Sequence, residues 1–307
     1  MRRINRRNIL ERGDFLPFLL LLPVMLVVFF VMFLPLVYGI VISLFDYHMG
    51  DLDFGRDFVG LGNYIRMMQD KVFWKSTVNT LYFTAGAIAG DLFFGTLVSV
   101  WIQSLNERIR PIIRPIVTIP LLVSPIIIGL IWKYMFNING GMVYWILSWF
   151  GLGAEQFPGL AGSATAMLCA IIAHWWQVIP FVVIVLSSGL VSIPNDYYEA
   201  AEMDGASFIQ KFFKISFPSL MPQYMVILLF NGVDAIKVFD IIYALTGGGP
   251  NNSTMSLSLY AYKNAFDHFD MGYAMAISNA TMLISFLVFG IVFVRYNAKA
   301  RKEGIKG

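Results

Sequence analysis

Long apolar segments alternate with short polar segments along the chain. The apolar segments lie near residues 15–45, 76–103, 114–136, 164–190, 219–246 and 271–295. Each is longer than the about 20 residues that an α-helix needs to cross a bilayer. The pattern predicts an all-α polytopic membrane protein with six transmembrane helices. Residues 15–296 would form the membrane domain, and residues 1–14 and 297–307 would form its two tails.

The first apolar segment follows a basic stretch, as the core of a signal peptide does. It carries no charged residue over 31 positions, from Phe15 to Phe45, whereas the apolar core of a signal peptide has about 7–15 residues. The sequence Leu34-Pro35-Leu36-Val37 stands where a small-residue cleavage site would be. We therefore expect a first span that the protein retains.

The distribution of Lys and Arg predicts the orientation of the spans. Fifteen of these residues lie on the side that holds both termini and residues 104–114 and 191–218, and five lie on the opposite side. Loops rich in Lys and Arg stay in the cytoplasm, so both termini and the segment 191–218 are expected there. Only 13% of the residues are charged, against about 25% in soluble domains, which agrees with a membrane protein.

The segment 191–218 is a polar island that differs from an ordinary linker. It holds six charged residues within nineteen positions, whereas residues 156–195 hold none. Ser192 or Asn195 is expected to cap a helix, with Pro194 in its first turn. Gly205 is expected to end that helix with a positive φ.

A second short helix is expected after Gly205. Phe208, Phe212 and Ile215 are spaced i, i+4, i+7, which places them on one helix face. Pro218 is expected to end this helix. The island is thus predicted to be two short helices joined by a bend.

The residue pattern of the island carries a family resemblance. Glu199-Ala200-Ala201 is followed by Gly205, and Ile215 leads to Phe217-Pro218. This pattern resembles the Glu-Ala-Ala loop of ABC importer permeases, although the spacing from Ile to Pro is one residue shorter than the family's usual form. With Asp204 and Ala206 included, it is similar to the carbohydrate-uptake branch, which contains the maltose- and glycerol-phosphate-type sugar permeases. Phe58-Val-Gly-Leu-Gly-Asn-Tyr64 and Leu245-Thr246-Gly-Gly-Gly249-Pro250 are also similar to segments of sugar permeases.

The resemblance implies a place for the chain in a larger transporter. It implies two ATPase subunits, a second related permease and an extracytoplasmic solute-binding protein, in a bacterial or archaeal plasma membrane. ATP and Mg²⁺ would bind to the ATPase, because this chain has no Gly-x-x-x-x-Gly-Lys-Ser/Thr phosphate loop and needs no cofactor. Membrane lipid, and no nucleic acid, is expected around it. The residues that would couple to the ATPase are Glu199, Ala200, Ala201, Asp204, Gly205 and Ala206.

No motif in the sequence predicts an enzyme. There is no Gly-x-Ser-x-Gly nucleophile elbow. The three histidines, His48, His174 and His268, are far apart in sequence, and the single cysteine, Cys169, lies in an apolar run. We therefore expect neither a catalytic residue nor a metal site.

Ionisable residues inside the predicted spans are candidates for function, because such residues usually face the bundle interior or a water-filled cavity. Asp91 suits either a functional role or an interhelical hydrogen bond. Asp234, Lys237 and Asp240 are spaced three apart, so each can reach the next across a helical turn. We expect Lys237 to pair mainly with Asp240, which would leave Asp234 for the solute.

The resemblance also implies a solute path, formed by the spans on either side of the island. The path residues would be Gln177, Phe181, Asn231, Asp234 and Ala235. The neighbouring His174-Trp175-Trp176 suits equally an aromatic anchor at the membrane interface before the kink of Pro180. The solute class stays open between a monosaccharide, an oligosaccharide, a polyol and a glycerol phosphate.

The main alternative function is an ion-coupled secondary transporter that uses intramembrane carboxylates. Asp91, Asp234 and Asp240 would be the candidate ion-coupling groups. Against this alternative, the two halves of the chain show no paired segments broken by Gly or Pro, and six spans are few for a carrier that works alone. The favoured function is a permease subunit of an ATP-driven importer for a sugar or related polyhydroxylated solute.

Overall fold

The computed structural model describes residues 16–50 and 57–302, and every element in these ranges is helical. The α-helices are α2 (Leu16–Val28), α3 (Leu34–Ile42), α4 (Gly62–Gln69), α5 (Lys71–Ser104), α6 (Arg110–Thr118), α7 (Pro125–Met135), α8 (Met142–Ser148), α9 (Ala166–Val191), α10 (Asn195–Met203), α11 (Phe208–Lys211), α12 (Phe217–Ser219), α13 (Met221–Ile236), α14 (Asp240–Leu245), α15 (Leu257–Phe266) and α16 (Met271–Lys302). Two π-helical turns, Phe29–Phe33 and Phe212–Ser216, and two 3-10 turns, Ile119–Leu122 and Gly159–Ala161, connect some of them.

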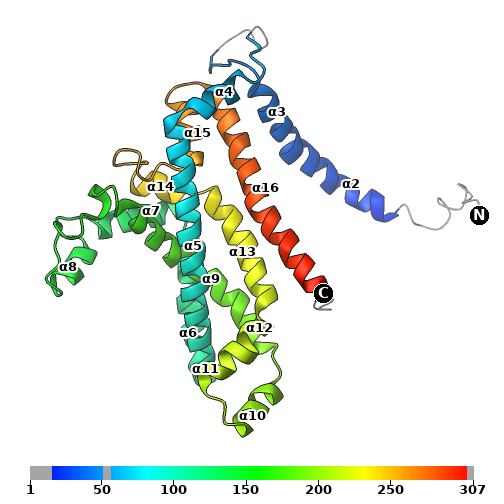
Figure 1. Ribbon diagram of the computed structural model, residues 1–307, viewed down its shortest axis with the longest axis vertical. Coiled ribbons are helices and arrows are strands. Elements are labelled where there is room, and N and C mark those ends of the chain that lie inside the picture. The colour runs from blue at the N-terminus through cyan, green and yellow to red at the C-terminus, as the bar shows by residue number, and fades with distance from the viewer. Residues whose placement is uncertain (1–15, 51–56, 303–307) are drawn as a thin grey trace, which may run out of the picture.

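The molecule is an elongated bundle whose longest helices are α5, α9, α13 and α16 (Figure 1). Helix α5 packs along α9 and α13, and α16 packs along α13 and α15. Helix α10 lies at one end of the bundle, and α4 and α15 lie at the other (Figure 1). The largest group of buried apolar side chains joins α5, α9 and the α13–α14 region, so these helices hold the rest of the chain in place.

The first span stands apart from the bundle. Helices α2 and α3, joined by a π-turn, diverge from α16 toward the N-terminus (Figure 1). In the apolar stretch Phe18–Ile42, no residue of the most apolar window is buried in this chain. Lipid or another subunit must therefore cover this span.

The glycine-rich stretch after the first span fixes the C-terminal end of that span. Asn63 is buried and its amide donates to the carbonyl oxygens of Ser43 and Phe45, at 3.0 and 2.8 Å. The Tyr64 hydroxyl lies 2.7 Å from Ser43 Oγ. Asn279 of α16 donates to both hydroxyls, so the three elements share one polar junction.

Four helices in the described ranges are long and apolar enough to cross a membrane, and six spans result if each of two bent helix pairs counts as one. The third predicted span is not a straight helix, because α6 and its 3-10 turn meet α7 at 98°. Pro120 and Pro125 flank this break and remove two backbone donors there. The fifth span also differs from prediction, because α13 ends at Ile236 and a separate helix α14 begins at Asp240.

The segments predicted as loops contain helices of their own. Helix α4 lies in residues 46–75, α8 in residues 137–163 and α15 in residues 247–270. Helix α5 starts at Lys71, earlier than the predicted span. Sequence periodicity does not predict such short helices, because their stability comes mostly from tertiary packing. Helix α15, for example, packs on α16 and α5.

Candidate functional site

The predicted coupling segment forms an exposed helix at one end of the bundle. Helix α10 contains Glu199, Ala200 and Ala201, of which the first two are exposed and the third is half-buried. Met203 is 88% exposed, an unusual fraction for an apolar side chain. The helix therefore presents small, acidic and apolar groups away from its own chain.

The end of α10 has the geometry that the sequence predicted. Gly205 has φ +74° and the exposed Asp204 precedes it. The N–H of Gly205 donates to Glu202 O and the N–H of the half-buried Ala206 donates to Ala201 O, both at 2.9 Å. This pair of bonds is a Schellman motif, in which a left-handed residue satisfies the last carbonyls of a helix. An added Cβ on Gly205 would meet nothing within 4 Å, so backbone conformation alone selects glycine there.

The start of α10 differs from the prediction. The cap position is Pro194, Asn195 is the first helical residue, and no side chain caps the helix. The Ser192 hydroxyl donates instead to Gly189 O of the preceding helix, at 2.7 Å. Ser192 follows the last turn of α9 directly, so its hydroxyl bonds back to α9 rather than forward to α10.

The second helix of the island is a helical run from Phe208 to Ser219 that is not one regular α-helix. Helix α11 has four residues and begins with a capping box between Ser207 and Gln210 that the Ser-x-x-Gln pattern could have revealed. A π-turn follows, and Phe208 remains 64% exposed. Pro218 does not end the helical run, because it lies in the first turn of α12, where its missing N–H costs nothing. The bend of 64° comes later, between Ser219 and Met221.

Two polar contacts hold α10 against the rest of the island. Lys211 Nζ lies 2.7 Å from Glu202 Oε1, and the Tyr198 hydroxyl lies 2.8 Å from Ser216 Oγ. Tyr198 also packs beside the apolar cluster that joins the ends of α9 and α13. These contacts connect α10 to the ends of both long helices.

The predicted path residues do not form one exposed surface. Gln177 and Phe181 are half-buried and one turn apart on α9. Asn231 and Ala235 are buried, and Ala235 belongs to the largest apolar cluster. Asp234 is the one exposed member of the predicted set.

Asn231 instead takes part in a buried polar cluster where three long helices cross. Asp91 of α5 is fully buried, and its Oδ2 accepts from Asn231 Nδ2 of α13 at 3.2 Å. His174 Nε2 of α9 lies 3.4 Å from the same oxygen. Asp91 Oδ1 is buried and has no hydrogen-bond partner among the residues that the structure describes. The cluster ties α5, α9 and α13 together, which favours the interhelical role for Asp91.

Trp175, next to His174, also packs between helices. Its Nε1 donates to the carbonyl oxygens of Gly86 and Ala87 on α5, at 3.1 and 3.2 Å. An added Cβ on Gly90 would lie 1.9 Å from the indole ring, so glycine is required for this close approach. Trp175 therefore serves as a packing residue between α5 and α9.

The predicted pairing of Lys237 was wrong. Lys237 Nζ lies 3.0 Å from Asp234 Oδ1, and the two side chains are 58% and 74% exposed. Helix α13 ends at Ile236, so Lys237 no longer has helical geometry toward Asp240, which starts α14. Asp234 is consequently compensated by its neighbour rather than left uncompensated.

The glycine run after α14 makes a tight turn and is followed by α15, which lies toward the end of the bundle opposite α10 (Figure 1). Gly247 and Gly248 have φ of +60° and +91°, which glycine adopts without strain. Lys263 Nζ of α15 donates to Gly247 O at 2.9 Å. The turn is thereby fixed against α15.

One group of potential metal ligands was not foreseen. Single donor atoms of Asp46, His48 and Asp270 lie within 4.8 Å of one another. The Asp270 carboxylate already pairs with Arg66 at 2.7 Å and accepts from the backbone N–H of Tyr273. These donors compensate Asp270 without a metal, and we assign none.

Comparisons with known proteins identify the family. The family model described as "Binding-protein-dependent transport system inner membrane component" matches residues 91–302. The chain belongs to this family. It is therefore a permease component, a multi-pass membrane protein of a transport system, which displaces the alternative of an ion-coupled carrier.

Several curated relatives cover almost the whole chain. The trehalose/maltose transport system permease protein MalF of Thermococcus litoralis is 38% identical, over 91% of this chain and 92% of that protein. The multiple sugar-binding transport system permease protein MsmF of Streptococcus mutans is 33% identical, over 94% and 95%. The sulfoquinovosyl glycerol transport system permease protein SmoG of Agrobacterium fabrum is 31% identical, over 92% and 91%.

Solved structures show the same fold. A chain from a bacterial alginate ABC transporter in complex with alginate pentasaccharide-bound periplasmic protein aligns with a TM-score of 0.81 and 20% identity, over 98% of each chain. A chain from the crystal structure of a bacterial ABC transporter that imports alginate aligns with a TM-score of 0.79 and 21% identity, over 96% of this chain and 98% of that chain. The all-helical architecture is thus that of an ABC importer permease.

Proposed function

We propose that this permease works in an ATP-driven importer that carries a sugar or related polyhydroxylated solute. The carbohydrate relatives support the solute class, because three of them that cover nine-tenths of the chain or more act in sugar or sugar-glycerol transport. In the proposed assembly, two ATPase subunits bind ATP and Mg²⁺ on the cytoplasmic side. A second permease completes the membrane part, and an extracytoplasmic binding protein delivers the solute.

The observation that carries the proposal is the exposed helix α10 with its left-handed end at Gly205. Glu199, Ala200 and Ala201 would dock on the ATPase, because small side chains allow close approach and α10 has few neighbours in its own chain. Asp204, Gly205 and Ala206 fix the direction in which the chain leaves this helix. The contacts of Glu202 and Tyr198 then pass movement to α9 and α13.

For the solute path, we propose Gln177, Phe181 and Asp234. Asp234 and Lys237 are exposed within a membrane-spanning region, where charged groups need water or another polar partner. A water-filled path along this face supplies that water. Asn231 and Ala235 support the path from behind, because both are buried in the helix packing.

Replacement of Gly205 by Val tests the coupling role. A β-branched residue is strained at φ +74°, so we expect α10 to lose its C-terminal geometry while the span helices still insert. Solute uptake per ATP hydrolysed should fall in proteoliposomes, or the ATPase should no longer co-purify. Gly205→Asn should retain coupling, since Asn tolerates the left-handed region.

Gly140→Val is the matched control. Gly140 also has a positive φ, +105°, and an added Cβ there would also meet nothing within 4 Å. It lies between α7 and α8, away from α10. Normal coupling in Gly205→Val, or an equal loss in Gly140→Val, would remove α10 from the coupling mechanism.

A further inference from the structure

Four aromatic rings form a continuous ladder on α14, α15 and the turn before α14. The ring of Phe239 stacks on Tyr243 with 5.2 Å between centroids and lies 5.0 Å from Tyr262. Tyr262 lies 4.9 Å from Phe266 and 5.6 Å from Tyr243. None of these residues belongs to the coupling helix or to the path proposed above.

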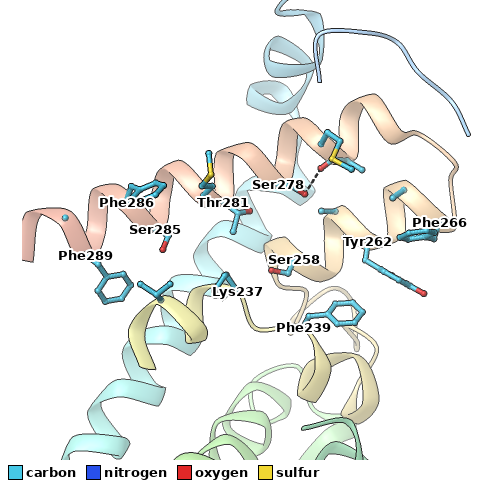
Figure 2. Close-up of a pocket in the computed structure, with 17 residues that line it drawn as sticks. Lys237, Phe239, Ser258, Tyr262, Phe266, Ser278, Thr281, Ser285, Phe286 and Phe289 are labelled. Atoms are coloured by element: carbon cyan, nitrogen blue, oxygen red, sulfur yellow. Dashed lines mark hydrogen bonds between the residues drawn. The ribbon is translucent and has the colours of Figure 1, made fainter. Parts of the chain in front are cut away.

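Three of the rings face a groove beside the charged pair. Phe239, Tyr262 and Phe266 line a cavity of about 650 Å³ between α13, α15 and α16. Figure 2 shows Lys237 between these rings and the α16 side chains Ser285 and Phe289. The volume lies within the roughly 300–1,000 Å³ that is typical of small-molecule sites.

The charges beside the groove argue against lipid as its occupant. Lys237 and its partner Asp234 are more than half exposed, and charged groups in contact with hydrocarbon are costly. The Lys237 end of the groove therefore needs water or another polar group beside it. Aromatic faces next to a wet, charged hydrogen-bonding group match the chemistry of a pyranose ring, which has an apolar C–H face and an edge of hydroxyl groups.

We infer that this groove is a binding subsite for pyranose rings of an oligosaccharide. The inference rests on the proposed sugar transport and deepens it. The rings of Phe239, Tyr262 and Phe266 would stack on the C–H faces of successive sugar units, and Lys237 would donate to their hydroxyl groups. Because the ladder continues over several rings, it favours an oligosaccharide over an open-chain polyol, which has no flat apolar face.

Transport by the complete complex in proteoliposomes tests the subsite. The chain is reconstituted with its second permease, the ATPase and the binding protein, and uptake of radiolabelled glucose, trehalose, maltose and maltotriose is measured at saturating binding protein. Phe239→Leu and Tyr262→Leu keep apolar bulk but remove the flat ring. Each should slow sugar uptake roughly three- to tenfold, most for the trisaccharide, while the binding protein still stimulates ATP hydrolysis.

Two controls separate stacking from folding. Tyr262→Phe keeps the ring and should transport faster than Tyr262→Leu, which separates loss of the ring from loss of the hydroxyl group. Phe230→Leu makes the same change at an exposed ring of α13 outside the groove and should also have no effect. If Tyr262→Leu does not fold, Phe266→Leu provides the same test, since Phe266 is half exposed at the end of the ladder.

The remaining outcomes distinguish an error in the subsite proposal from an error in the proposed sugar transport. If both Leu variants take up sugar at the parental rate, the subsite proposal is wrong, and the proposed sugar transport is unaffected. No uptake of any of the four sugars by the parent complex would overturn the proposed function and the subsite with it. Loss of the second permease from the Leu variants, with parental rates in the complexes that remain, would show that a helix of that subunit covers the groove, and this also overturns the subsite.

Discussion

At the residue scale, Asp91 shows how one buried carboxyl group organises three helices. Its carboxylate lies where α5, α9 and α13 cross, and its only donors in the described chain are Asn231 and His174, both bonded to Oδ2. A buried carboxylate with too few donors is expensive. Each donor therefore matters more to stability than an ordinary hydrogen bond does.

Removal of the Asn231 donor should destabilise the bundle. Asn231→Leu leaves Asp91 with His174 alone, and an unsatisfied buried group costs about 1–3 kcal/mol. We expect the free energy of unfolding to fall by that amount in an SDS titration of the detergent-solubilised protein. The double variant Asp91→Leu/Asn231→Leu should lose less than the sum of the two single variants, because it removes both polar partners. Additive losses would mean that Asp91 and Asn231 are not coupled.

The charged stripe shows where residue spacing stops being informative. Asp234, Lys237 and Asp240 are equally spaced in sequence, so a continuous helix lets Lys237 reach either carboxylate. The helix ends at Ile236, and Lys237 retains helical geometry only toward Asp234. Sequence spacing predicted that the three charges interact, but the pairing depended on a helix end that spacing does not reveal.

At the element scale, one polar network joins four helices at the end opposite α10. Asp70 precedes α5 and accepts hydrogen bonds from Tyr260 of α15 and Tyr273 of α16, at 2.5 and 2.6 Å. Arg66 of α4 lies over the ring of Tyr273, with 4.2 Å from its guanidinium carbon to the ring centroid, and pairs with Asp270. The network fixes the positions of α4, α5, α15 and α16 relative to one another.

The ionisation of Asp70 should make this network sensitive to acid. Burial by itself raises the pKa of Asp70, but the hydrogen bonds from Tyr260, Tyr273 and the backbone of Val72 outweigh it, so the net pKa is lowered. A lowered pKa in the folded protein contributes stability above the unfolded value of about 3.9, and this stability is lost as pH falls through the folded pKa.

Asp70→Asn tests this contribution. The variant keeps the shape but cannot act as an ionised acceptor, so its melting temperature in detergent should be below that of the parent at pH 7. Between pH 5 and pH 3 the parent should lose more of its melting temperature than the variant does. Parallel curves for the two proteins would show that Asp70 contributes nothing that depends on its charge.

Element predictions succeeded where helices are long and failed where they break. The predicted segment near 164–190 matches both ends of α9, and the predicted segment near 271–295 matches the start of α16. Long apolar runs determine where such helices lie. The break between α6 and α7 lies inside an equally apolar run, so hydropathy does not mark it. Gly205 was predictable because the position after a helix end selects glycine for a local reason.

At the scale of the whole molecule, the proposed coupling helix and the proposed sugar subsite lie far apart along the bundle. Helix α10 occupies one end, and the glycine turn, α15 and the aromatic ladder lie toward the other (Figure 1). The long helices α9 and α13 connect them. This arrangement suits a subunit that receives solute at one membrane surface and contacts an ATPase at the other.

The distribution of Lys and Arg predicts which membrane surface each end faces. Fifteen of these residues lie on the side of α10 and the termini, against five on the side of the glycine turn, and the richer side stays in the cytoplasm.

Reporter fusions in the full-length protein should therefore indicate a cytoplasmic site after residues 110 and 210, and an external site after residues 160 and 255. The four sites form two matched pairs. Residues 110 and 210 lie in α6 and α11, and residues 160 and 255 precede α9 and α15. A cytoplasmic signal at residue 160 would mean that the orientation of the spans before it is reversed or that their number is smaller. An external signal at residue 210 would separate α10 from any cytoplasmic ATPase, and the coupling mechanism would fail with it.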